Sequence, residues 1–144
     1  MTGNRFADNV GSVGVIAVEH RSYGANWQFR MHGNTFVANR ADAVLWVDYD
    51  VMMGVANNIF AYNEGVAFQT VEVTDFFDHN LWWGNDVNAL GVSLGENAVL
   101  LDPLFVAFTD NGDPTDDDLN VQPESPALGA GIGLGGSARD IGAL

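Results

Sequence analysis

Arg30 and His32 are the residues whose types and spacing best suit a binding or proton-transfer site. They lie two residues apart, and His32 comes two residues before Asn34. An imidazole ionises near neutral pH and can carry a proton, and a guanidinium binds carboxylates through paired hydrogen bonds. Asp78 holds the same position before Asn80 that His32 holds before Asn34. We therefore expect these side chains to belong to one strip of surface.

The strip follows from the alternation of side chains along a strand. Residues three and five before each Asn are mostly apolar, as a buried face requires, so residues two and four before it should point outward. We read this strip either as a small polar site, with His32 as proton carrier and Arg30 as anion clamp, or as an ordinary solvated face. The outward residues are Arg30, His32, Gly54, Ala56, Phe76 and Asp78.

An acidic loop over residues 110–118 is the best candidate for a metal site, because clustered oxygen ligands on a loop suit Ca²⁺. Asp113, Thr115, Asp117 and Glu124 fall at positions 1, 3, 5 and 12 of a calcium loop, but position 6 is Asp118 where an EF-hand requires Gly. The sequence therefore excludes an EF-hand. It leaves open a looser calcium site or a solvated acidic loop. The candidate ligands are Asp113, Asp116, Asp117 and Asp118.

Trp83 is the aromatic residue that could contact a ligand. In the pair Trp82-Trp83 on a strand, the two rings face opposite sides, so we expect Trp82 in the core and Trp83 at the surface. An exposed indole can stack on a sugar ring, or it can pack under the following loop. Both interpretations stay open at this point.

The elements that must position these residues come from a repeat, Asn-x-Phe/Trp-x-x-Asn, which occurs four times at spacings of 30, 24 and 22 residues. A period of this size is typical of repeat architectures. Stacked coils would place the four aromatic rings in one ladder, with the Asn residues at bends where their amides bond to the next coil. The aromatic residues are Phe6, Phe36, Phe60 and Trp82.

Apolar, β-prone runs flank these motifs, and no stretch has a sustained helical period with good caps. The sequence therefore predicts an all-β fold: a right-handed parallel β-helix (solenoid) of about four to five short coils with an irregular C-terminal tail. We expect coils over residues 1–106 and, over residues 107–144, an acidic loop and tail that pack on them within a single domain. A β-sandwich with chance recurrences of Asn and Phe is the alternative.

The composition limits the range of functions. The 144 residues are 47% hydrophobic and contain no Cys, which excludes disulfides and thiolate chemistry. A net charge of -14, with 19 acidic residues against five Arg, repels nucleic acids and anionic membranes. An anionic polymer would bind only through a local Arg patch or a bridging Ca²⁺. No apolar run approaches the ~20 residues of a membrane span.

Two stretches carry a resemblance to a known superfamily. They are the Asn-x-Phe-x-x-Asn coils, ending in His79-Asn80-Leu81-Trp82-Trp83-Gly84-Asn85, and the tail with Leu101-Asp102-Pro103-Leu104-Phe105-Val106 and Arg139-Asp140-Ile141-Gly142-Ala143. Together they resemble the right-handed parallel β-helix (pectate lyase-like) superfamily, which includes pectate lyases, polygalacturonases and alginate epimerases. Within it they look like the C-terminal coils and tail of a bacterial β-helix repeat protein. The resemblance implies sugar sites on the outer face of the strands and an extracellular or cell-surface location. It assigns no catalytic residue to any position here, so catalytic residues stay unknown.

Three functional classes follow. We favour a non-catalytic or degenerate β-helix module for binding or assembly, with carbohydrate as the ligand and either no cofactor or calcium. The alternatives are a polysaccharide lyase, hydrolase or epimerase, or a fragment of one, and a structural or ice-binding solenoid. The chain opens at a bend, which leaves the first coil incomplete, and solenoid ends need covering. We therefore expect a homo-oligomer through the uncapped N-terminal coil.

Overall fold

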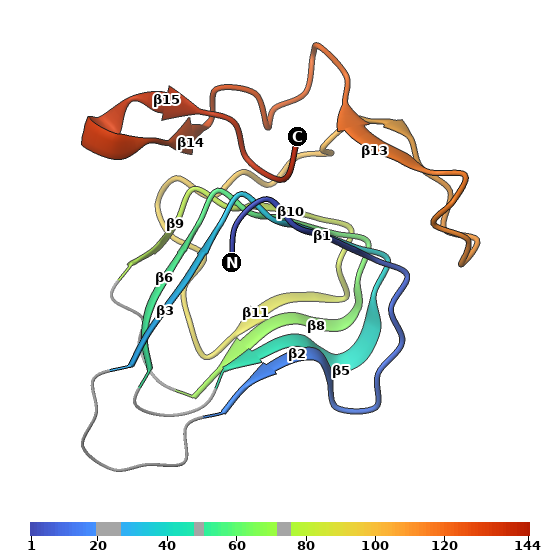
Figure 1. Ribbon diagram of the computed structural model, residues 1–144, viewed down its shortest axis with the longest axis horizontal. Coiled ribbons are helices and arrows are strands. Elements are labelled where there is room, and N and C mark those ends of the chain that lie inside the picture. The colour runs from blue at the N-terminus through green and yellow to red at the C-terminus, as the bar shows by residue number, and fades with distance from the viewer. Residues whose placement is uncertain (20–26, 48–50, 72–75) are drawn as a thin grey trace.

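A computed structural model describes residues 1–19, 27–47, 51–71 and 76–144, and their regular structure is almost entirely β (Figure 1). Short strands separated by bends follow from the β-prone runs and the recurring Asn and Gly residues. In the described residues no helix is long and apolar enough to cross a membrane. The strands up to residue 90 are β1 (Arg5–Ala7), β2 (Gly14–Val18), β3 (Trp27–His32), β4 (Thr35–Val37), β5 (Arg40–Val47), β6 (Val51–Ala56), β7 (Ile59–Ala61), β8 (Glu64–Thr70), β9 (Phe76–Asp78), β10 (Leu81–Trp83) and β11 (Val87–Leu90).

These strands form three parallel sheets, with orders β1-β4-β7-β10, β2-β5-β8-β11 and β3-β6-β9. Consecutive strands belong to different sheets, so the chain visits each sheet in turn and then returns to the first (Figure 1). The all-β class is confirmed, and the stacked parallel sheets are compatible with a β-solenoid. We call each successive set of three strands a coil.

The aromatic residues of the repeat stack in the core as predicted. Phe6 lies on Phe36 with ring centroids 4.8 Å apart, Phe36 on Phe60 at 4.9 Å, and Phe60 on Trp82 at 4.4 Å. Phe36, Phe60 and Trp82 are buried. Parallel, overlapping rings add stacking energy to the hydrophobic gain of burial. The register that pairs these residues across β1, β4, β7 and β10 is therefore fixed by the aromatic column.

The Asn residues form two ladders through their side-chain amides, also as predicted. In the first ladder each Nδ2 donates to the Oδ1 of the next residue at 2.9 Å. In the second ladder the corresponding distances are 2.8–3.0 Å. Buried polar groups are tolerated when they are hydrogen-bonded, and the ladders supply these bonds. The ladders are Asn4–Asn34–Asn58–Asn80 and Asn9–Asn39–Asn63–Asn85.

The left-handed backbone conformation at each bend belongs to the residue before the ladder Asn. Ala38, for example, precedes Asn39 and has a φ of 51°. This conformation turns the chain sharply, so that the chain passes from one sheet to the next. The residues that adopt it are Gly3, Gly33, Asn57 and His79 at one bend, and Asp8, Ala38, Tyr62 and Gly84 at the other.

The tail after residue 102 covers the outer face of the β1-β4-β7-β10 sheet (Figure 1). A second apolar cluster joins Phe105, Leu119 and Ile141 of the tail to Ile59 and Leu81 of the sheet. The central strands β4 and β7 of that sheet are thus buried on both faces. The division at residues 106 and 107 stays a prediction. The tail contains β12 (Phe105–Ala107), β13 (Asp118–Val121), β14 (Gly131–Ile132), a 3₁₀ turn (Leu134–Gly136) and β15 (Ala138–Arg139).

Candidate functional site

The outer face of the β3-β6-β9 sheet carries the strip expected from the sequence. Pairing places Arg30 beside Gly54 and Gly54 beside Phe76, and in the next outward row His32 lies beside Ala56 and Ala56 beside Asp78. Arg30 and Phe76 are exposed, His32 is half-buried, and Ala56 is fully buried. The two rows therefore differ: the first is open to solvent, and the second is partly covered.

Gly54 lets two side chains approach each other over the sheet. A Cβ at position 54 would lie 3.8 Å from Cγ of Arg30 and 3.9 Å from Nε2 of His32. Both side chains therefore border the same point above the glycine. On its other side, Phe76 presents an aromatic ring that is 41% exposed.

The tail adds a second arginine to the strip, Arg139, which local sequence reasoning missed. The antiparallel hairpin of β14 and β15 is anchored on Asn57, whose Nδ2 donates to the carbonyl of Ile132 at 2.8 Å. The N–H of Ile132 donates back to Oδ1 of Asn57 at 2.9 Å. Asn57 directly follows β6, so this anchor holds the hairpin at the end of the strip. We call Arg30, His32 and Arg139, with Gly54 and Phe76, the cationic strip.

The electrostatics of His32 agree with this geometry. Its pKa is lowered, first by burial and then by the positive charges of Arg30, Arg139 and the Met1 amino group. Desolvation and like charges both disfavour the protonated imidazole. An anion bound on the strip would offset the repulsion and favour protonation of His32.

The arginines differ in their partners. Arg40 pairs with Glu64 at 3.0 Å and Asp110 at 3.2 Å, and Arg5 donates to the carbonyl of Ala143 at 2.8 Å and to Oδ1 of Asn120. Within the described residues Arg30 has only a long 3.4 Å contact with Gln28, and the Arg139 guanidinium has neither an ion pair nor a hydrogen bond. Arg30 and Arg139, the two arginines on the strip, thus have no acidic partner within the described residues.

Asp78 lies in the same row as His32 but is occupied by structural hydrogen bonds. Its Oδ1 accepts from the N–H groups of His79 and Asn97 at 2.9 Å, and its Oδ2 accepts from Nδ2 of Asn97 at 2.7 Å. Burial acts to raise its pKa, but the hydrogen bonds from Asn97 and His79 outweigh burial and leave the pKa lowered. Asp78 is therefore an ionised anchor for the segment around Asn97.

Trp83 lies apart from the cationic strip. It belongs to β10 in the β1-β4-β7-β10 sheet, where it pairs with Ala61, and its side chain is partly exposed. Its outward orientation, opposite to that of the buried Trp82, agrees with the alternation read from the sequence. The structure does not bring Trp83 together with Arg30, His32 or Asp78.

The acidic loop uses its carboxylates mainly for local turns. Asp113 accepts from the N–H and hydroxyl of Thr115, Asp116 from Asn111, Asp117 from the N–H of Thr109, and Asp118 from Asn120. In the described part of the chain no group of three or more His, Cys, Asp or Glu residues could hold a metal ion. The calcium site stays a prediction.

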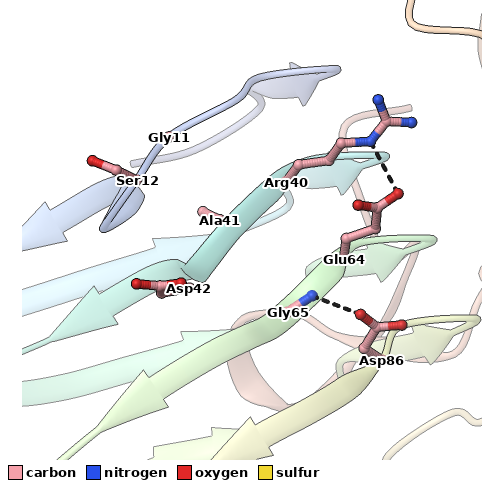
Figure 2. Close-up of a pocket in the computed structure, with 8 residues that line it drawn as sticks. All are labelled: Gly11, Ser12, Arg40, Ala41, Asp42, Glu64, Gly65 and Asp86. Carbon is pink, nitrogen blue, oxygen red and sulfur yellow. Dashed lines mark hydrogen bonds and ion pairs between the residues drawn. The ribbon is translucent and has the colours of Figure 1, made fainter.

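An open, polar groove of about 490 Å³ lies elsewhere on the surface, between successive coils (Figure 2). Its carboxylates are Asp42, Glu64 and Asp86. Glu64 is paired with Arg40, and Asp86 accepts from the N–H of Gly65 at 2.9 Å. We call it the acidic groove; it is lined by Gly11, Ser12, Arg40, Ala41, Asp42, Glu64, Gly65 and Asp86.

No family model matches the chain, and neither a curated protein nor a solved structure is significantly similar to it.

Proposed function

We propose that the chain is a non-catalytic module that binds an anionic saccharide on the cationic strip. In this proposal its fold is a right-handed parallel β-helix of the pectate lyase-like type, with four to five coils. The observation that carries the binding proposal is the pair of arginines beside His32 that form no ion pair within the described residues, in a chain of net charge -14. Free guanidinium groups on so acidic a protein attract an anion to one place on its surface.

The chemistry of the strip suits a sugar acid. A guanidinium binds a carboxylate through two parallel hydrogen bonds, and a protonated imidazole donates a third. The exposed ring of Phe76 lies across Gly54 from Arg30 and His32 and offers a flat apolar face for a pyranose ring. Gly54 leaves the space between them free of a side chain.

Calorimetric titration at low salt tests this proposal. Trigalacturonate should bind, and the neutral galactose trisaccharide of the same length should bind much more weakly. Arg30→Gln and Arg139→Gln should each weaken binding about 10- to 150-fold, since a charge-assisted hydrogen bond contributes about 1.5–3 kcal/mol. Arg40→Gln removes the same charge away from the strip and is the matched control. Equal binding of the two trisaccharides, or equal loss in all three variants, would contradict the proposal.

A polysaccharide-cleaving enzyme is the second candidate, and the acidic groove favours it. Glycoside hydrolysis uses two carboxyl groups on either side of the bond, and the groove contains Asp42, Glu64 and Asp86. Release of reducing ends from an acidic polysaccharide, abolished by Glu64→Gln and retained in Arg139→Gln, would establish this activity. We favour binding, because Glu64 and Asp86 are already engaged by Arg40 and the Gly65 amide.

A further inference from the structure

At the N-terminal end of the stack, the outermost strands pair with no further strand of the described residues. β1, β2 and β3 are the outermost strands of their sheets, and residues 1–2 pair with the end of β3 through the Thr2–His32 bridge and through hydrogen bonds of Met1 with Arg30 and His32. On this face the ring of Phe6 stacks on Phe36 from one side only. We call the free edges of β1 and β2, with Phe6, Asn4 and Asn9, the N-terminal face.

The two Asn ladders have a direction. In every step the N–H and Nδ2 of an Asn donate to Oδ1 of the Asn in the following coil, as Asn34 does to Asn58 at 3.1 and 2.9 Å. Asn4 and Asn9 are therefore the first donors of their ladders. Both residues are exposed, and no donor in the described residues reaches their own Oδ1 atoms. Each ladder thus ends on this face with an Oδ1 atom that can accept a hydrogen bond from a partner.

The backbone on this face shows the complementary pattern. Inside the stack, the N–H of Thr35, Ile59 and Leu81 donates to the carbonyl of the Asn one coil earlier, at 2.8–2.9 Å. Arg5 holds the equivalent position in the first coil, and Val10 is equivalent to Arg40, whose N–H donates to the carbonyl of Asn9. A partner must therefore offer, at each bend, two amide donors and one carbonyl acceptor. An Asn residue in the ladder conformation offers all three.

We propose that the N-terminal face docks a β-solenoid coil that runs in the same direction and carries the Asn-x-Phe/Trp-x-x-Asn motif. The contact continues the coil-to-coil interface already repeated within the molecule: two Asn amides donate to Asn4 and Asn9, and an aromatic ring stacks on Phe6. A second copy of the chain packed face to face fits less well, because it sets Oδ1 acceptors opposite acceptors. The partner's two bend Asn residues are thus its recognition elements.

A fusion supplies this coil directly. A second copy of residues 34–57 replaces Met1–Gly3, so that its last residue precedes Asn4 as Asn57 precedes Asn58 in the chain. The matched control fusion carries Asn34→Asp and Asn39→Asp in the added copy only, which exchanges each Nδ2 donor for an oxygen of the same size. Hydrogen exchange at Arg5 and Val10 is measured in both fusions and in the parent chain, together with sedimentation.

We expect exchange at Arg5 and Val10 to slow at least about tenfold in the Asn fusion, with a higher melting temperature, and to stay near the parent rate in the Asp fusion. The amides of β7 in the buried stack report whether the original coils remain folded in each protein. Equal protection in the two fusions, or none in either, overturns the proposal. So does a parent chain that sediments as a dimer with Arg5 and Val10 already protected, because a second copy then covers the face.

Discussion

Asn58 illustrates how single residues maintain the stack. Its side chain is completely buried, and every polar atom has a partner. Oδ1 accepts from the N–H and Nδ2 of Asn34, and Nδ2 donates to Oδ1 of Asn80 and to the carbonyls of Met31 and Ala56. The amide therefore joins three coils at once. Its contribution depends on having a donor and an acceptor in one planar group, which few side chains offer.

Replacing Asn58 by Asp should destabilise the protein strongly. The substitution keeps the shape but turns a donor into an acceptor that faces Asn80 and two carbonyls, and it adds a buried charge. We expect a loss of about 3 kcal/mol or more in the free energy of unfolding at pH 7, measured by urea denaturation. Asn9→Asp, at the exposed end of the other ladder, is the control and should cost less than about 1 kcal/mol. Similar losses at both positions would contradict this role for the ladder.

Asp8 should lower the stability of the fold at neutral pH. Both its carboxylate oxygens are buried without a hydrogen-bond partner, and burial, followed by the negative charges of Asp117 and Asp110, raises its pKa above the usual 3.8. The folded state thus holds this proton more tightly than the unfolded chain, so stability falls as pH rises through the raised pKa. Asp8→Asn should raise the melting temperature at pH 7 by about 2 °C, and the gain should vanish below pH 3.8.

Asp113→Asn is the comparison for Asp8→Asn, and the charge of Asp113 makes the smallest of the contributions that raise the pKa of Asp8. Hydrogen bonds from Thr115 lower the pKa of Asp113, so this carboxylate favours the fold above pH 3.8 and the effect disappears as the pH falls through its lowered pKa. Its amide variant should therefore be no more stable than the parent at pH 7. A melting temperature that rises equally in both variants would indicate relief of general charge repulsion and would contradict the specific role of Asp8.

At the scale of elements, strands and bends could be read from local patterns, and the tail could not. The motif located β1, β4, β7 and β10 because its aromatic residue and its Asn residues each impose a strict local geometry. The tail segments that cover the β1-β4-β7-β10 sheet have no such period, and their contacts join residues far apart in the chain. Among the bend residues, Ala38 and Tyr62 adopt positive φ although neither type favours it, so only the stack explains them.

The tail should contribute to stability through Ile141. This side chain is completely buried in the apolar cluster that joins the tail to the sheet. Ile141→Ala removes apolar contacts and leaves a cavity, so we expect a loss of about 2–4 kcal/mol in the free energy of unfolding. Leu128→Ala, at a position that is 40% exposed in the same tail, should cost less than about 1 kcal/mol. Equal losses in chemical denaturation would show that the tail does not pack as described.

For the whole molecule, the key feature is the position of the arginines that form no ion pair in the described part of the chain. The chain has 19 acidic and five basic residues, yet two arginines that have no acidic partner within the described residues lie beside His32. Arg30 and His32 could be located from the sequence because the strand alternation fixes which residues face outward. Arg139 could not, because a hairpin anchored on Asn57 brings it there from the tail. The carboxylate of Asp78 likewise accepts a hydrogen bond from Asn97, and no local sequence pattern connects these two residues.

Titration of His32 by NMR, with and without trigalacturonate, tests the central claim most directly, because the imidazole lies within the cationic strip. Without ligand we expect its pKa to lie below 6.5, owing to burial and to Arg30 and Arg139. With trigalacturonate the pKa should rise, because a bound carboxylate stabilises the imidazolium, and binding should tighten as the pH falls through this range. The neutral trisaccharide should leave the titration unchanged. A His32 pKa that trigalacturonate does not move would contradict an anion site on this face.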